Sequence, residues 1–121
     1  MSTPKLNPIK ANIPPRSADG PAKALQLVVF DISAGGVGLT LPPDDVGLRV
    51  GAQFVGISID LPDVGRITAD LRVRNLYDVT MPNGKVQQRA GCEFVKLPGS
   101  MTKLIQRYIM QIERERKARG A

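Results

Sequence analysis

The sequence contains no histidine, no tryptophan and a single cysteine among its 121 residues. With one cysteine the chain cannot form an internal disulfide, and without histidine the common zinc sites are excluded. The absence of histidine also excludes Ser–His and Cys–His catalytic triads. Aromatic residues make up only 4% of the chain, so few side chains are available to stack on bases or sugars. We therefore expect a binding domain that is not an enzyme and holds no metal.

Long hydrophobic runs are also missing. No segment approaches the roughly 20 apolar residues that a membrane helix needs, and the N-terminus lacks the apolar region of a signal peptide. The length suits about one domain, which is large enough to bury a core without disulfides or a structural metal. We therefore expect a single cytoplasmic domain without membrane insertion.

Positive charge is concentrated near the C-terminus. The chain carries 17 basic and 11 acidic residues, a net charge of +6, and residues 103–121 hold six of the basic and two of the acidic ones. Such a segment can attract the phosphates of nucleic acid, lipid or nucleotide. It also fits the solvated end of a helix, because Glu113 and Glu115 each precede a basic residue by four positions. We favour the solvated helix, and no DNA binding is expected.

Alternating apolar and polar residues predict β-strands over much of the chain. Segment 9–13 alternates in this way, but prolines on both sides predict an edge strand. The dense apolar run 25–30 predicts a strand buried on both faces. In the clearest strand, after a turn at 62–65, the apolar face holds Ile67, Ala69, Leu71 and Val73. Further positions predicted to face the core are Val37, Leu39, Leu41, Val55, Ile57, Ile59, Leu61, Val86, Ala90, Cys92 and Phe94.

Turn and helix signals complete the predicted order of elements. The Pro-Asn-Gly sequence at 82–84 predicts a hairpin, because Asn and Gly tolerate positive φ. From Gly99 onward the apolar period changes to about 3.6, which predicts a helix with Ser100 as its N-cap and Gly120 at its end. Its apolar stripe consists of Met101, Leu104, Ile105, Tyr108, Ile109 and Ile112. About six antiparallel strands and one helix favour a small barrel or sandwich, and a barrel leaves no exposed edges.

One segment, Asp-Ile-Ser-Ala-Gly-Gly-Val-Gly-Leu at 31–39, is rich in polar and glycine residues. By itself it fits a hairpin turn, in which Asp31 and Ser33 accept hydrogen bonds from backbone N–H groups and glycine supplies positive φ. A glycine-rich phosphate loop requires a following helix, whereas a strand follows here, so P-loop and dinucleotide-binding motifs are excluded. The residues alone favour a turn over a ligand site.

The same segment resembles the Asp/Asn-x-Ser-x-x-Gly signature of PilZ domains, the bacterial receptors for cyclic di-GMP, with Asp31, Ser33 and Gly36 at the motif positions. The segments that further resemble the flagellar-brake branch of this family are 91–94, 97–100, 104–109 and 113–116. The resemblance spans residues 4–119 and implies a mainly β fold, a six-stranded antiparallel PilZ-type β-barrel with a C-terminal α-helix. A single PilZ domain over 1–121 would comprise an N-terminal edge strand and loop at 1–20, a barrel core at 21–96 and the helix at 99–119.

The resemblance also implies a function. A cyclic di-GMP-binding receptor domain of this branch regulates bacterial motility, needs no cofactor, and has flagellar motor proteins as partners, with recruitment from the cytoplasm to the flagellar basal body. Asp31 would accept hydrogen bonds from the donor edge of guanine, and the Ser33 hydroxyl would join a base or a phosphate. Gly35 and Gly36 would let the backbone approach the ligand without a Cβ. The alternative is a PilZ-fold protein-interaction module that does not bind nucleotide.

The sequence departs from the family in its arginines. PilZ receptors carry an Arg-x-x-x-Arg motif before the barrel, and the cations upstream of Asp31 are Lys5, Lys10, Arg16 and Lys23. We expect the upstream domain and its arginine linker to lie outside this chain, the alternative being a degenerate member, and we expect weakened ligand binding in either case. The outward-facing arginines of the predicted strands, interpreted as solvated and alternatively as ligand contacts, are Arg72, Arg74 and Arg89.

Overall fold

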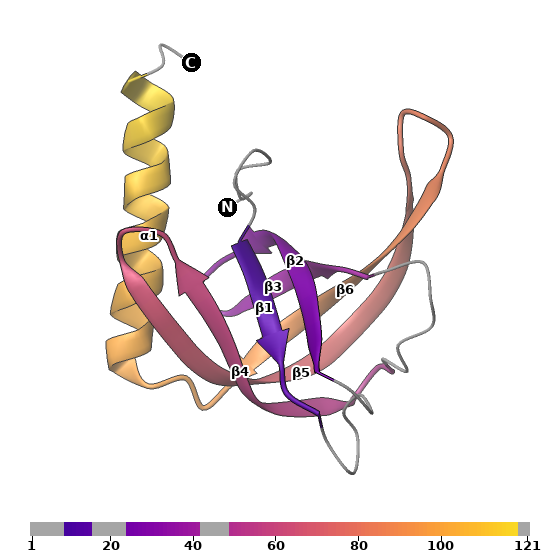
Figure 1. The fold of residues 1–121 in the computed structure, drawn as a ribbon, viewed down its shortest axis with the longest axis horizontal. Helices are drawn as coiled ribbons and strands as arrows, with labels where there is room; N and C mark the ends of the chain where they lie inside the picture. Colours follow the sequence, from indigo (N-terminus) through magenta and orange to yellow (C-terminus); the bar gives the residue numbers. More distant parts are fainter. Residues whose placement is uncertain (1–8, 16–23, 42–48, 119–121) are drawn as a thin grey trace.

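The structure is a computed structural model that describes residues 9–15, 24–41 and 49–118. Its elements, in chain order, are β1 (Ile9–Ile13), β2 (Leu25–Ile32), β3 (Gly36–Thr40), β4 (Gln53–Leu61), β5 (Gly65–Thr80), β6 (Val86–Val95) and α1 (Gly99–Ala118). The six strands form a closed antiparallel barrel in the order β1-β2-β3-β6-β5-β4. Helix α1 stands at one side of the barrel, and the end of the β5–β6 hairpin projects from the other side (Figure 1).

Barrel closure corrects the prediction of an edge strand at 9–13. Strand β1 pairs with β2 along its whole length and also with β4, where Ala11 faces Ile59. Pro14 follows the last residue of β1, so it removes no hydrogen-bond donor from either ladder. The proline signal therefore marks the end of the strand. The loop predicted for the rest of 1–20 lies partly outside the described residues.

The hydrophobic core fills the barrel, as the alternation in β5 predicts. Ile67, Ala69, Leu71 and Val73 are all buried. The prediction that segment 25–30 is buried on both faces is wrong, because β2 alternates: Leu27 and Val29 are buried, whereas Val28 and Phe30 are only partly covered. A closed barrel of this size has water outside, so each strand needs one apolar face.

Two residues predicted to face the core are instead exposed. Val55 is 39% exposed, and the neighbouring Phe54 takes the core position. The register of β4 shifts between Phe54 and Ile57, and Gly56 has a φ of 74°, so a β-bulge turns Val55 outward. Val86 is 63% exposed because it belongs to the projecting part of the hairpin, beyond the barrel.

The hairpin itself is confirmed. Gly84 has a φ of 84°, as the Asn-Gly signal predicts, and the Met81 N–H donates to the carbonyl of Lys85 at 2.8 Å. The Asn83 side chain also accepts a hydrogen bond from the Lys85 N–H at 3.0 Å. These contacts stabilise the turn of a ribbon that extends past the neighbouring strands β3 and β4.

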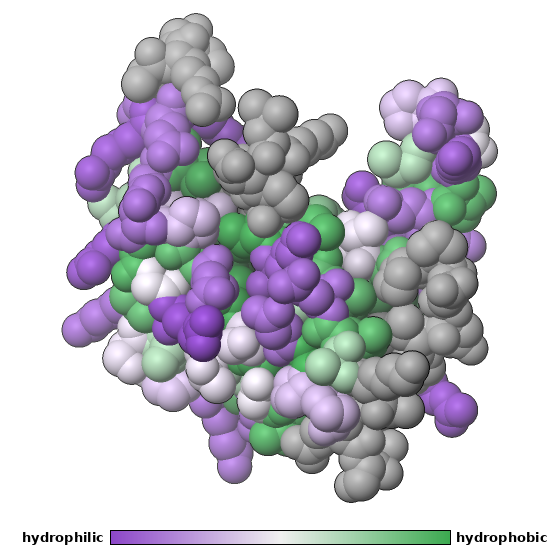
Figure 2. Space-filling model, viewed as in Figure 1, coloured by the Kyte–Doolittle hydropathy of each residue, from purple (hydrophilic) through white to green (hydrophobic). Residues whose placement is uncertain are grey.

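The predicted helix is present, but it begins one residue earlier than its predicted cap. Because α1 starts at Gly99, Ser100 lies in its first turn, and the carbonyl of Pro98 accepts hydrogen bonds from the N–H groups of Met101 and Thr102. Gly120 lies outside the described residues. Ile105, Tyr108 and Ile112 are buried in the barrel's core cluster. Figure 2 shows hydrophilic residues along the outer edge of α1. No helix in the described segments is both long and apolar enough to span a lipid bilayer.

Candidate ligand-binding site

The turn between β2 and β3 carries the predicted site residues. Asp31 lies near the end of β2, Gly36 begins β3, and Ser33 and Gly35 lie between the strands. The Ser33 N–H donates to the carbonyl of Gly36 at 2.9 Å, and the Ser33 hydroxyl accepts from the N–H of Gly35 at 3.3 Å. The turn is therefore held by its own hydrogen bonds, as its interpretation as a hairpin predicts, but the positive φ predicted for its glycines is wrong, because neither Gly35 nor Gly36 has one.

The two predicted glycines differ in their surroundings. A Cβ at Gly36 would collide with the backbone carbonyl of Cys92 on β6, so glycine here permits close packing of two strands. A Cβ at Gly35 would meet only the Ser33 hydroxyl, at 3.9 Å. Position 35 is therefore the one with open space on the side where a ligand could approach.

Asp31 belongs to a row of residues that crosses four strands on the outer face of the barrel. It pairs with Gly38 on β3, Gly38 pairs with Gly91 on β6, and Gly91 pairs with Asn75 on β5. The middle two positions have no side chain of their own. Neighbouring side chains lie over these two positions, the Phe30 ring over Gly38 and the Asn75 carboxamide over Gly91, and the row has a carboxylate at one end and a carboxamide at the other.

Two β-bulges shape the ends of this row. The register shifts between Val29 and Asp31 in β2, and between Val73 and Asn75 in β5. A bulge adds one residue to its strand, so two consecutive residues avoid the core instead of one. In β5, Arg74 and Asn75 are both exposed. Bulges thus place two neighbouring side chains at each end of the glycine row.

These features enclose a shallow hollow with a volume of about 370 Å³. All four predicted residues line it. Strands β5 and β6 contribute Arg74, which the sequence interpretation had given only as an alternative ligand contact, and three residues that it had not joined to the motif, namely Asn75, Tyr77 and Glu93. No local signal links them to the motif, because they are about 40 to 60 positions away in the chain and meet it only through strand pairing. The hollow combines acceptors, donors and a cation on a glycine-rich floor.

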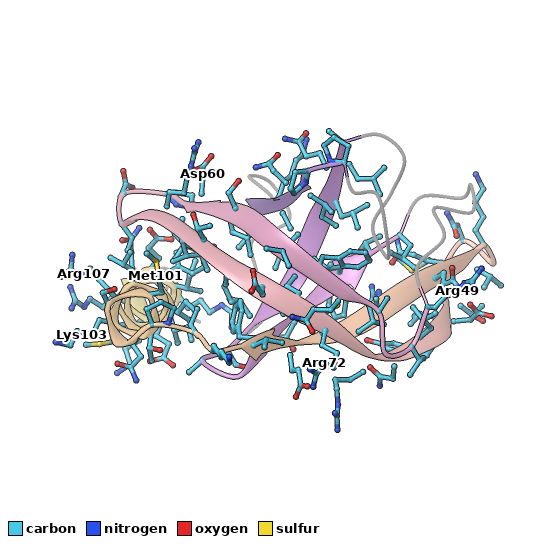
Figure 3. The ribbon with its side chains drawn as sticks, turned by 90° about the horizontal axis from the view of Figure 1, so that it is seen from below. Arg49, Asp60, Arg72, Met101, Lys103 and Arg107 are labelled. Carbon is cyan, nitrogen blue, oxygen red and sulfur yellow. The ribbon has the colours of Figure 1, made fainter. Side chains whose placement is uncertain are left out.

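Glu93 holds two of the three arginines of β5 in ion pairs. Its Oε1 atom is 3.3 Å from Nη1 of Arg72 and 3.4 Å from Nη1 of Arg74. Arg72 also donates to Gln53 on β4 at 3.4 Å. Figure 3 shows Arg72 on the outer side of the barrel, pointing away from the interior. The interpretation of these arginines as merely solvated is therefore incomplete, because both make cross-strand contacts to Glu93.

Arg89 is stacked on an aromatic ring. Its guanidinium carbon lies 4.4 Å from the centroid of Phe30, and its Nε donates to the side chain of Gln87 at 3.0 Å. The Phe30 ring covers Gly38, where a Cβ would collide with it. Phe30 is therefore seated against the backbone of β3 and forms the wall of the hollow beside Asp31.

Cys92 lies under the hollow and faces the core. Burial raises the pKa of its thiol to about 12, so it is protonated at neutral pH. A protonated, buried thiol is a poor nucleophile and a small hydrophobic side chain. In the described segments, no cluster of three or more acidic, cysteine or histidine side chains could hold a metal ion.

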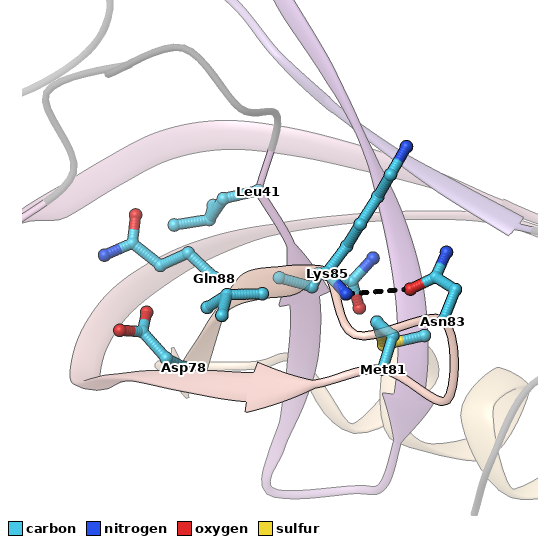
Figure 4. Close-up of a pocket in the computed structure, with 8 residues that line it drawn as sticks. Leu41, Asp78, Met81, Asn83, Lys85 and Gln88 are labelled. Carbon is cyan, nitrogen blue, oxygen red and sulfur yellow. Dashed lines mark hydrogen bonds between the residues drawn. The ribbon is translucent and has the colours of Figure 1, made fainter.

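A second hollow of about 380 Å³ lies at the projecting hairpin (Figure 4). Leu41, Asp78 and Lys85 are among its lining residues, with no glycine. None of the predicted site residues reaches it. The hollow at the β2–β3 turn is therefore the stronger candidate, because it brings all four predicted residues together with a guanidinium and a carboxamide.

Comparison with known proteins identifies the family. The family model for the PilZ domain matches residues 6–111 of the sequence. Flagellar brake protein YcgR of Azoarcus sp. (strain BH72) is 42% identical over 119 residues, which cover 98% of this chain and 46% of that protein. Flagellar brake protein YcgR 1 of Dechloromonas aromatica (strain RCB) is 38% identical over 122 residues, covering 100% of this chain and 46% of that protein. The chain spans about half the length of these curated relatives.

Solved structures share the fold. The PilZ domain of YcgR from Escherichia coli, determined with c-di-GMP, matches with a TM-score of 0.80 at 22% identity, over 99% of this chain and 92% of that one. The complex of MrkH from K. pneumonia with c-di-GMP matches with a TM-score of 0.81 at 20% identity, over 98% of this chain and 52% of that one. The predicted six-stranded barrel with a C-terminal helix is confirmed. The chain belongs to the PilZ domain family and is similar to the PilZ domains of flagellar brake proteins.

Proposed function

We propose that this chain is a cyclic di-GMP receptor domain that acts in the regulation of bacterial motility. The observation that carries the proposal is the meeting of Asp31, Ser33 and Gly35 in one hollow with Arg74 and Asn75. Support comes from two solved structures with the same fold that were determined with c-di-GMP, and from the relatives with 42% and 38% identity, which are named flagellar brake proteins. The domain binds a ligand and catalyses no reaction.

The chemistry of the hollow suits this ligand. Cyclic di-GMP presents two guanines, each with N–H donors on one edge and acceptors on the other, and two phosphates. The Asp31 carboxylate accepts hydrogen bonds and repels phosphate, so it takes the donor edge of a guanine. The Ser33 hydroxyl can donate or accept, and the open space at Gly35 lets a flat base approach the backbone. Gly36 contributes by holding β3 close to β6.

Isothermal titration calorimetry of cyclic di-GMP into the 121-residue chain tests the proposal. We expect binding at low salt that is lost or weakened by at least about tenfold in Asp31→Ala, because a guanine edge would lose its charged acceptor. Asp78→Ala, which removes a carboxylate from the hairpin hollow, is the matched control and should bind as the parent does. Absence of heat with the parent chain, or equal affinity of Asp31→Ala and the parent, would contradict the proposal.

A signalling domain must also pass its state to a partner, and we propose flagellar motor proteins for this role. The relatives' name, flagellar brake protein, supports this proposal. Such a partner implies that the domain acts in the cytoplasm and is recruited to the flagellar basal body. Cross-linking in cells with motor components as bait, compared at low and high cyclic di-GMP, tests this step.

The second candidate function is a PilZ-fold interaction module that binds protein and no nucleotide. The observation that favours it is the outer face of α1, where Met110 is 52% exposed between the exposed cations Arg107 and Arg114. Lys103 and Arg107 point away from the barrel (Figure 3). Capture of a partner that is insensitive to cyclic di-GMP, together with no heat of binding, would support this function over the first.

A further inference from the structure

We propose that Arg74 binds a phosphate group of the ligand, and that Glu93 holds Arg74 in place until the phosphate displaces it. This inference rests on the proposed function, because it names a further ligand-binding residue of the same hollow. On this inference, a residue of the barrel itself supplies the positive charge that binds a phosphate. The described residues upstream of Asp31 include a single cation, the exposed Lys10 on β1.

The position of each arginine along β5 decides which of them lines the hollow. Arg72 and Arg74 lie on the same strand and pair with the same carboxylate atom, yet Arg74 lines the hollow and Arg72 does not. The extra residue between Val73 and Asn75 is Arg74 itself. Arg74 therefore lies on the outer face directly beside Asn75, the residue of β5 that pairs with the glycine row, whereas Arg72 lies two positions earlier.

The ion pair of Arg74 is weak enough to be exchanged. Its side chain is 64% exposed, and ion pairs between exposed groups contribute little to stability because water screens them. Glu93 remains paired with Arg72, 3.3 Å away, when Arg74 turns to a ligand. Release of Arg74 therefore leaves no carboxylate without a counter-ion.

The charges are separated across the hollow. Asp31 lies on the β2 side and Arg74 on the β5 side, with β3 and β6 between them. Three strand spacings of about 4.8 Å separate these two walls. A ligand that carries a base at one end and a phosphate at the other can meet both, with the base at Asp31 and the phosphate at Arg74.

Glu93 itself opposes the phosphate. It lines the same hollow and carries a negative charge close to the guanidinium that the phosphate must reach. Neutralising it should therefore strengthen binding, since both the repulsion and the competition for Arg74 disappear. A residue that merely stabilises the fold would not have this effect, because its loss would weaken binding or leave it unchanged.

Calorimetry with cyclic di-GMP and matched variants of the 121-residue chain tests the inference. We expect Arg74→Ala to weaken binding by at least about tenfold, and Arg72→Ala, the matched control on the same carboxylate, by no more than about twofold. Glu93→Gln should bind at least about threefold more tightly than the parent chain. Binding by Arg74→Ala should also depend less on salt than binding by the parent, since one charge pair is gone. Circular dichroism melts confirm that each variant folds, and Arg74→Gln replaces Arg74→Ala if the latter does not.

The outcomes separate this inference from the proposed function. If the parent binds, Asp31→Ala does not, and Arg74→Ala equals Arg72→Ala, the proposed function stands and the role of Arg74 is overturned. Weaker or unchanged binding by Glu93→Gln overturns the competition between Glu93 and phosphate. If neither the parent nor Glu93→Gln binds, the proposed function fails for this chain, and the inference fails with it.

Discussion

The carboxamide of Asn75 on β5 lies against the backbone of Gly91 on β6, in the space that a Cβ at position 91 would occupy. The two residues are cross-strand partners, so the side chain of one fills the place that the other leaves empty. This contact seats Asn75 at the edge of the hollow beside Arg74.

Gly91→Ala should therefore displace Asn75 and alter the hollow. We expect a loss of about 1–2 kcal/mol in the free energy of unfolding, because the new methyl group forces the carboxamide to move. Urea denaturation measures the loss. Combining Gly91→Ala with Asn75→Ala should recover most of it, since the smaller side chain makes room. Equal stability of the single and double variants would show that the clash is relieved in another way.

Gly36→Ala should lower the stability of the fold, whereas Gly35→Ala should lower only the affinity for the ligand. Gly36→Ala meets the fixed carbonyl of Cys92, and we expect a loss of about 3 kcal/mol in the free energy of unfolding. Gly35→Ala has room and should leave the melting temperature unchanged while weakening cyclic di-GMP binding, since its methyl group occupies the ligand's approach. Thermal melts paired with calorimetry measure both quantities. A stable Gly36→Ala variant would contradict the packing argument.

The buried thiol of Cys92 should make stability fall in alkaline solution. Its pKa is raised from 9.0 to about 12 in the folded chain, so between these values the unfolded chain loses the proton and the native chain keeps it. Stability is thus fully present below pH 9 and is lost as the pH rises toward 12. We expect the parent chain to lose about 1 kcal/mol more than Cys92→Ala between pH 8 and pH 10. Urea titrations at the two pH values measure the difference, and parallel losses in both chains would refute this origin.

The helix should prove to be part of the barrel's core. Ile105 is fully buried in the core cluster, so Ile105→Ala should lower the free energy of unfolding by about 3 kcal/mol. Met110→Ala is the matched control on the exposed side of α1 and should change it by less than about 0.5 kcal/mol. Chemical denaturation followed by far-ultraviolet circular dichroism measures both. If Ile105→Ala unfolds in two separate transitions, the helix is not coupled to the barrel.

Much of the fold could be predicted from local patterns. The alternation around Ile67 and Leu71 identifies β5, the Asn-Gly pair identifies the hairpin, and the change of period after Gly99 identifies the helix. These features depend on neighbours within a few positions, so the sequence displays them directly. The fold class could be predicted for the same reason, and the motif at Asp31 and Ser33 added the resemblance to PilZ domains.

Three of the errors lie where strand pairing overrides the local pattern. Segment 9–13 was predicted as an edge strand, although it pairs on both sides. Val55 was predicted to face the core, although the bulge at Gly56 turns it outward. Val86 continues the inward alternation of β6 into a region that has no barrel to cover it. In each case the neighbouring strand decides, and that neighbour is distant in the chain.

The sequence by itself therefore determined the order of elements, the glycine-rich turn and the polar residues it carries. Only the tertiary structure decided which side chains share the hollow with them. Side chains alternate with a period of two, so a single bulge reverses the faces of every residue that follows it. The bulges beside Asp31 and Asn75 thus brought a carboxylate and a carboxamide to the same outer face as Arg74, across two strands that have glycine at positions 38 and 91.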